Sequence, residues 1–212
     1  MRILRNMLIG TGLLFLSSCG VQPQTNDTAD VNKGDIIIEN IMTRGSVRSF
    51  TSEPVSRDTL QLIMRAGMQA PSGLNKQDWE IRMIDNQDKL NAFSDILKKA
   101  NPNAPDRYPG KNSFGNAAAV AFVACETEGT FAQVDAALLG ENMLLAAHGL
   151  GLGAVIQAGP LAITSDNADA QAFIKDLGFS AGYKPLFIIL IGHPDEAVVA
   201  KERDHSKAKF VD

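Results

Sequence analysis

Three side chains near the start of the chain have the types and the spacing to bind a phosphate. Arg44, Ser46 and Arg48 occupy alternate positions, and in an extended segment alternate side chains project to one side. Two guanidinium groups and a hydroxyl suit a phosphate, because each charge-assisted hydrogen bond contributes about 1.5–3 kcal/mol and arginine binds bidentately. Lys201 and Arg203 supply a second pair of cations near the other end. These residues leave two interpretations open, an anion site and solvated surface charges.

A second cluster of polar side chains follows one of the expected helices. Residues 70–79 include a proline and a glycine, which favour an irregular loop. Asn75 and Gln77 carry amides that both donate and accept hydrogen bonds, and they precede Trp79, the single tryptophan of the chain. A binding loop and an ordinary turn both fit this composition.

Other patterns that could carry chemistry lack the surroundings that the chemistry needs. Residues 178–182 match the G-x-S-x-G of hydrolase nucleophile elbows, but that serine requires a strand before it and a helix after it, and here the expected order is reversed. The glycines at 149, 151 and 153 end a helix, whereas a dinucleotide loop opens one. The histidines have no partners at metal-ligand spacing. We therefore expect two structural turns, no metal site, and a core position for Cys125, which follows a buried strand.

The composition excludes several classes of protein. The chain has 212 residues, 45% of them hydrophobic and 21% charged, which argues against a wholly disordered chain, a collagen-like repeat and a multi-span membrane protein. A net charge of −4 and a pI of about 5.4 argue against a nucleic-acid partner. Two cysteines are too few for a disulfide framework or a four-thiolate zinc site.

The first residues are typical of a bacterial lipoprotein signal. Arg2 and Arg5 precede a short apolar run, which is too short to cross a hydrocarbon core that needs about 20 residues. Small residues then lead to Cys19, as in a lipobox, so we expect cleavage before Cys19, acylation of its thiol and a cell-envelope location, periplasmic or at the outer membrane. An ordinary cleaved signal with a chance cysteine is the alternative. This predicts a signal peptide at 1–18, a flexible tether at 19–34 and one domain at 35–212.

Helix and strand patterns alternate through the remaining chain. Apolar residues at helical or strand spacing, with capping and turn residues between them, define the elements. We expect helices around 36–42, 56–67, 90–97, 134–149 and 170–177, and strands around 80–85, 117–124 and 186–191. A turn-rich stretch with three prolines covers 101–115. Many helices and strands buried on both faces indicate a layered α+β sandwich.

The helix expected at 134–149 is apolar on two sides. Leu139, Met143 and Ala147 form one continuous stripe at i, i+4 and i+8, which the core of one domain need not cover. We expect this stripe to associate with a second copy of the chain, because a two-fold homodimer is the commonest way to bury such a surface.

Four segments together resemble the flavin-dependent nitroreductase family. Family members read R-R-S-x-R-x-F where this chain has Arg44 to Phe50, and A-P-S-x-x-N-x-Q-P-W where it has Ala70 to Trp79. The helix from Asn142 to Gly153 resembles the family's buried interface helix. The I-G-x-P turn at 191–194 and the K-x-R pair at 201–203 complete the match, which runs from about Ile36 to Arg203.

The resemblance implies a fold and a site. The fold is a three-layer sandwich with a central, mostly antiparallel sheet, and FMN lies at the interface of a homodimer. The phosphate of FMN is held by Arg44, Gly45, Ser46, Arg48, Lys201 and Arg203. The flavin is lined, in part from the neighbouring subunit, by Pro71, Ser72 and Asn75. Gln157 and Ala158 lie near the N5 edge of the ring. We expect the loop at 101–115, with Tyr108 and Phe114, to act as a lid that sets specificity.

The implied reaction is a ping-pong reduction. NAD(P)H donates a hydride to the flavin and leaves, and a nitroaromatic, quinone or similar acceptor is then reduced, with no catalytic side chain assigned. Three departures from the family pattern stand out: Gly45 replaces a basic residue, Asp78 replaces a proline, and 154–156 lack an aromatic residue. An exported chain also meets little nicotinamide, so a flavin-holding or small-molecule-binding lipoprotein with little turnover is the alternative, and a serine hydrolase is a more distant one.

Overall fold

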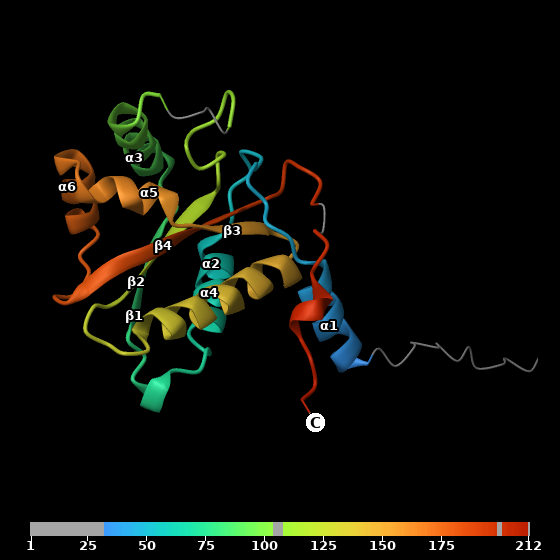
Figure 1. Ribbon diagram of the computed structural model, residues 1–212. Helices are drawn as coiled ribbons and strands as arrows, with labels where there is room; N and C mark the ends of the chain where they lie inside the picture. The colour runs from blue at the N-terminus through green and yellow to red at the C-terminus, as the bar shows by residue number, and fades with distance from the viewer. Residues whose placement is uncertain (1–31, 104–107, 199–200, 212) are drawn as a thin grey trace, which may run out of the picture. The chain divides into compact units, whose positions relative to one another are not determined.

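An antiparallel sheet of four strands forms the centre of the fold (Figure 1). The computed structural model describes residues 32–103, 108–198 and 201–211. The strand order is β1-β2-β4-β3, and each pair of neighbours is antiparallel. The two central strands are buried where their sequences are continuously apolar, which is nearly the whole of β2 and the second half of β4. The strands are β1 (Trp79–Ile84), β2 (Ala119–Glu126), β3 (Gly153–Gln157) and β4 (Tyr183–Gly192).

Helices cover both faces of the sheet and enclose two hydrophobic clusters. In Figure 1, α3 and α6 lie on one side of the sheet and α2 and α4 on the other. The helices are α1 (Lys33–Thr43), α2 (Arg57–Gly67), α3 (Gln87–Ala100), α4 (Ala132–Gly149), α5 (Gly159–Ala162) and α6 (Ala168–Asp176), with 3-10 turns at η1 (Gly73–Asn75), η2 (Ile163–Ser165) and η3 (His205–Lys207). This three-layer α+β arrangement confirms the expected fold.

Local sequence signals explain where several helices begin. Ser56 caps α2, and its side chain accepts a hydrogen bond from the N–H of Thr59. Asn86 and Asn167 cap α3 and α6 in the same way. The predicted apolar stripe of α3 faces the core, where Phe93 is completely buried and stacks on Phe173 with ring centroids 4.2 Å apart.

The prediction that the stripe of Leu139, Met143 and Ala147 on α4 lies outside the domain core is wrong. Leu139, Met143 and Ala147 are completely buried inside this chain, where α4 packs on α2 and the sheet. Gly67 of α2 makes the close approach possible, because a Cβ there would overlap the side chain of Met143. The other face is the exposed one, with Leu138 41% accessible to solvent.

The two glycine-rich motifs form the turns that the sequence predicted. Residues 178–182 link α6 to β4, and Gly178 and Gly182 both have positive φ. Gly151, with φ of 75°, turns the chain from α4 into β3. Cys125 is buried in the core as expected, and burial raises the pKa of its thiol.

The chain separates into a unit at 1–32 and a unit at 33–212, and the elements above belong to the second. None of the described helices has the length and hydrophobicity needed to cross a bilayer. The predicted signal peptide and Cys19 lie outside the described residues.

Candidate functional site

The segment that carries the arginines is extended and lies along the edge of the sheet. Ser46 forms a parallel bridge with Ala154 of β3, and the N–H of Val47 donates to the carbonyl of Ala154 at 3.1 Å. Val47 is 2% exposed and points into the core, whereas Ser46 and Arg48 are exposed. The alternation predicted from the sequence is therefore present, because a buried valine forces its two neighbours outward.

Arg44 has a buried donor without an acceptor. Its Nε lies 3.4 Å from Oε1 of Glu141 on α4, but no group among the described residues accepts a hydrogen bond from it. A buried polar atom is normally hydrogen-bonded, and among the described residues the ion pair with Glu141 is the contact that compensates this nitrogen. A cavity of about 190 Å³ adjoins it, and Leu144, His148 and Ala154 contribute to the walls.

Two charged side chains that the sequence analysis did not single out hold the segment in place. Glu196 accepts hydrogen bonds from the backbone N–H groups of Arg48 and Ser49. Lys111 donates to the Ser49 hydroxyl at 2.8 Å, to the Phe50 carbonyl at 2.7 Å and to Asp195 at 2.6 Å. These partners are more than 60 residues away from the segment, so no local pattern could have revealed them.

The glycine that replaces a basic residue is explained by packing. A Cβ on Gly45 would overlap Cγ1 of Val198. The valine therefore occupies the space next to position 45, and a longer side chain could not be accepted there without moving the segment that contains Val198. The basic side chain that the family pattern has at position 45 is therefore absent from this chain.

The loop at residues 70–79, which the family resemblance predicts to line the flavin and which we call the flavin loop, has an unusual backbone. Leu74, Asn75 and Gln77 have φ of 54°, 55° and 54°, in the left-handed region that costs L-residues roughly 1–2 kcal/mol each. The Ser72 hydroxyl stabilises this shape by accepting a 3.0 Å hydrogen bond from the N–H of Gln77. The N–H of Gly73 donates to Asp135 in the first turn of α4 at 2.9 Å. Pro71 and Asn75 are exposed on this loop.

The end of β3 brings together two other predicted residues. The Nε2 of Gln157 donates to the hydroxyl of Tyr108 at 2.7 Å, so the loop before β2 contacts the strand at this point. Ala158 is exposed and follows directly. The prediction that Phe114 belongs to a lid is wrong, because its side chain is completely buried and stacks on Phe93 at 5.9 Å.

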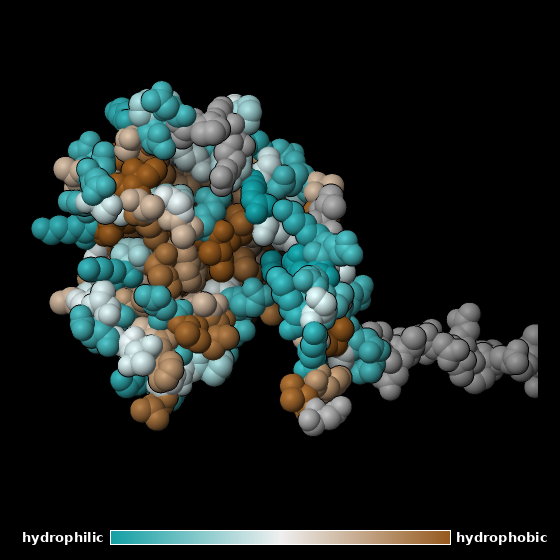
Figure 2. Space-filling view, in the orientation of Figure 1, coloured by the Kyte–Doolittle hydropathy of each residue, from teal (hydrophilic) through white to brown (hydrophobic). Residues whose placement is uncertain are grey.

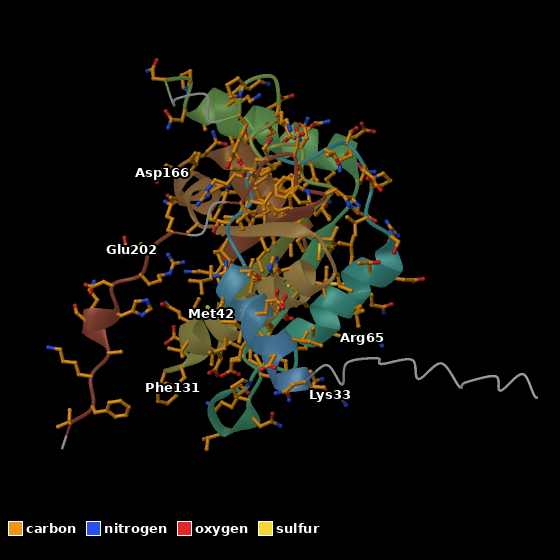
Figure 3. All side chains as sticks on the ribbon, turned by 90° about the vertical axis from the view of Figure 1, so that its right-hand side faces the viewer. Lys33, Met42, Arg65, Phe131, Asp166 and Glu202 are labelled. Carbon is orange, nitrogen blue, oxygen red and sulfur yellow. The ribbon has the colours of Figure 1, made fainter. Side chains whose placement is uncertain are left out.

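Lys201 and Arg203 lie on an exposed segment near the C-terminus. Figure 3 shows the stretch around Glu202 standing apart from the helices. The guanidinium of Arg203 donates to the carbonyl of Lys201 at 3.1 Å. Within the described residues, no hydrogen bond or ion pair joins this pair to the Arg44–Arg48 segment.

The flavin loop and the Arg44–Arg48 segment lie at different ends of α4 (Figure 1). The loop is bonded to Asp135 in its first turn, whereas the cavity beside Arg44 is lined by Leu144 and His148. At 1.5 Å per residue, these contacts are roughly 13–20 Å apart along the helix. On a single copy of the chain, the loop and the Arg44–Arg48 segment are therefore separate from one another.

Comparison with known proteins agrees with the fold. An NADPH-flavin oxidoreductase of Vibrio harveyi is 27% identical over 183 residues, which cover 78% of this chain and 69% of that protein. A nitroreductase with bound FMN from Bacteroides fragilis has a TM-score of 0.72 at 26% identity, covering 83% of this chain and 98% of the other. An FMN-bound nitroreductase from Desulfitobacterium hafniense has a TM-score of 0.75, also at 26% identity, covering 84% and 98%.

The three-layer α+β arrangement is therefore a nitroreductase-like fold. The sequence model of the nitroreductase family matches residues 41–193, which are most of the chain. This protein belongs to the nitroreductase family.

Proposed function

We propose that the protein is an FMN-dependent oxidoreductase that uses NAD(P)H to reduce small acceptors such as nitroaromatics and quinones. The family assignment supports it, as do the names of the relatives, which include an NADPH-flavin oxidoreductase and FMN-bound nitroreductases. The observation that carries it is the position of Arg44 in the wall of a cavity, beside the outward-facing Ser46 and Arg48. This donor set fits the phosphate of FMN in charge and hydrogen-bonding capacity.

The chain's own residues bind and orient the cofactor. Arg44, Ser46 and Arg48 hold the phosphate, and the buried contacts of Val47 and Phe50 fix the segment, so little ordering entropy is lost on binding. Lys201 and Arg203 add two further cations from the C-terminal segment. The cofactor held by these residues would supply the chemistry of hydride transfer from a nicotinamide and electron transfer to the acceptor.

The ring end of the cofactor lies at Gln157 and Ala158 in this proposal. The Gln157 amide is held by the Tyr108 hydroxyl, which fixes one amide N–H toward the tyrosine and leaves the amide oxygen available as an acceptor. The second amide N–H also remains available to a ligand. We assign positioning to these groups and no catalytic side chain.

We also propose that the active form is a homodimer. The outer face of α1 is apolar, with Ile37, Ile38 and Met42 all more than half exposed. On α4, Val134 and Leu138 are exposed as well, and Figure 2 shows hydrophobic surface over α4 and over β3. Apolar surface of this extent favours association. A second copy would also supply the flavin loop that each Arg44–Arg48 segment lacks.

The location that we propose is the bacterial cell envelope, with attachment through an acylated Cys19. The basic start, the short apolar run and the small residues before the cysteine support it. Arg2 and Arg5 are not adjacent, so the export signal is not of the twin-arginine type, and FMN would be bound after translocation.

Stopped-flow absorbance tests the proposed activity. The purified protein reconstituted with FMN should be yellow, should bleach on mixing with NADH or NADPH, and should regain its colour when a nitroaromatic or quinone is added. A protein that binds FMN but is not bleached by either nicotinamide would instead be a flavin carrier. Failure to retain FMN at micromolar concentration would contradict both functions.

A further inference from the structure

One carboxyl side chain lies buried beside the flavin loop. Asp135, in the first turn of α4, is 5% exposed. Burying a carboxyl group is unfavourable unless hydrogen bonds replace its water. Its Oδ2 accepts from the N–H of Gly73 at 2.9 Å, and the start of a helix is a favourable place for negative charge. The contact joins α4 to the loop across 62 residues of sequence.

The loop needs an external anchor of this kind. Internal hydrogen bonds define its shape, since the N–H of Asn75 donates to the Ser72 carbonyl and the N–H of Gln77 to the Ser72 hydroxyl, both at 3.0 Å. Such bonds do not determine where the loop lies relative to the helices. Gly73 is where it meets α4, held by Asp135 and covered by the ring of Phe131, which a Cβ on Gly73 would approach to 3.2 Å.

The loop depends on this hydrogen bond because part of its backbone is left-handed. Strained conformations persist only where the surrounding structure determines them, and the strained residues Leu74 and Asn75 directly follow Gly73. Without the acceptor, the Gly73 N–H would lose its partner, and the loop would relax toward ordinary backbone conformations. Ser72 and Asn75 would then no longer be in place before the ligand arrives.

We propose that Asp135 is a positioning residue for the flavin site, which it serves by holding the loop at Gly73 so that Pro71, Ser72 and Asn75 are ordered before FMN binds. The inference rests on the proposed function. Asp135 acts through Gly73 and does not touch the cofactor. Preorganisation of this kind raises affinity because the ordering cost is met during folding.

Three variants separate positioning from general stability. Asp135→Ala removes the acceptor, and Asp135→Asn retains a side-chain oxygen in the same place. Asn86→Ala is the matched control, because it also deprives a backbone N–H of its side-chain acceptor, that of Lys89, but on α3, whose core residues pack in the other hydrophobic cluster. Thermal unfolding of each variant reports its loss of stability.

Flavin affinity is the first measurement. By fluorescence titration, Asp135→Ala should bind FMN about tenfold more weakly, and riboflavin by a similar factor, since the loop faces the flavin and not the phosphate. Asp135→Asn should remain within about threefold of the wild type, and so should Asn86→Ala. Equal losses in Asp135→Ala and Asn86→Ala would overturn the proposal, and so would unchanged affinity in Asp135→Ala.

A flavin-free measurement keeps this inference separate from the proposed function. Trp79 is 8% exposed and directly follows the loop, where its backbone N–H donates to the Gln77 carbonyl at 2.7 Å, so the emission of this single tryptophan reports on loop order. Asp135→Ala should shift the emission to the red and increase acrylamide quenching, whereas Asn86→Ala should not. Unchanged emission would overturn the role of Asp135 even if FMN binds, and a wild type that binds no FMN would overturn the proposed function whatever the tryptophan shows.

Discussion

At the scale of single residues, the character of the phosphate site depends on which donors are already occupied. The backbone N–H groups of Arg48 and Ser49 are taken by Glu196, so they are not free for a ligand. The Arg48 guanidinium makes a 3.3 Å contact with the Ser46 carbonyl and is otherwise exposed. The side chains of Arg44, Ser46 and Arg48, and not the backbone, therefore recognise the anion in our proposal.

Replacing Arg48 with alanine should weaken FMN binding by about 1.5–3 kcal/mol, or roughly ten- to a hundredfold, because one charge-assisted phosphate contact is lost. Riboflavin, which has no phosphate, should lose much less affinity. The measurement is a pair of fluorescence titrations, with Arg65→Ala as a control that removes an exposed arginine from α2. Equal losses for the two flavins would show that Arg48 does not contact the phosphate.

At the scale of elements, α4 organises both the core and the surface proposed for dimerisation. Its inner face packs on α2 through Leu139 and Met143, which are completely buried, and its outer face exposes Leu138. Leu138 and Leu139 are adjacent in sequence, but Leu138 is exposed and Leu139 is buried. They therefore provide a test in which the same residue type has two different roles.

We expect Leu138→Asp to dissociate the dimer while the domain stays folded, because the charge is solvated in the monomer but buried and unpaired at an interface. Leu139→Ala should lower the free energy of unfolding by about 2–5 kcal/mol and leave the assembly of the folded fraction unchanged. Sedimentation velocity at micromolar concentration, combined with circular dichroism, distinguishes these effects. A monomeric wild type that still carries FMN would contradict the dimer.

At the scale of the whole molecule, one ion pair and one hydrogen-bonded carboxylate tie β1 and the residue after it to distant elements. Arg57 at the start of α2 donates to Asp85 just after β1, and this hydrogen bond lowers the pKa of Asp85. Burial acts to raise the pKa of Glu80, but hydrogen bonds from Ser180 and Arg82 outweigh it and the pKa is lowered. Both carboxylates therefore stabilise the fold in the charged form.

These shifts predict a loss of stability in acid. Because the folded-state pKa of Asp85 lies below its unfolded value of about 4, its contribution is fully present above pH ~4 and is lost as the pH falls through the folded pKa. Asp85→Asn should cost about 0.2–1 kcal/mol at pH 7, the range for an exposed pair, and less at pH 3, because the contribution declines as the pH falls from the unfolded pKa through the folded one. Urea unfolding at pH 7 and pH 3 measures both values, and Arg57→Met should show the same dependence. A constant difference across this range would contradict the assignment.

The proposed anchor can be tested on the full chain. Cys19→Ala should yield a folded protein that no longer partitions with membranes, since the acyl chains supply the attachment. Ser18→Ala keeps a small residue before the cysteine and should remain membrane-bound. The measurement is fractionation after a salt wash, and a Cys19→Ala protein that still sediments with membranes would show that lipid modification is not the anchor.

The sequence by itself determined the elements and the local geometry of the arginine segment. Helix caps such as Ser56 and the buried run of β2 depend on residues within a few positions of one another, so a linear pattern carries them. The outward projection of Ser46 and Arg48 follows in the same way from Val47 between them. The irregular loop at 70–79 was also predictable, because glycine and proline set turns locally, whereas its assignment to a flavin came from the family resemblance.

The tertiary structure alone decided which side of each element is covered. The sequence shows that α4 is apolar on two faces, but only the packing of α2 buries Met143 and leaves Leu138 outside. Phe114 lies in a turn-rich stretch yet is buried against Phe93. Asp135 meets Gly73 across 62 residues. Burial and hydrogen bonding between distant segments depend on how the chain folds back on itself. Local sequence periodicity therefore cannot predict them.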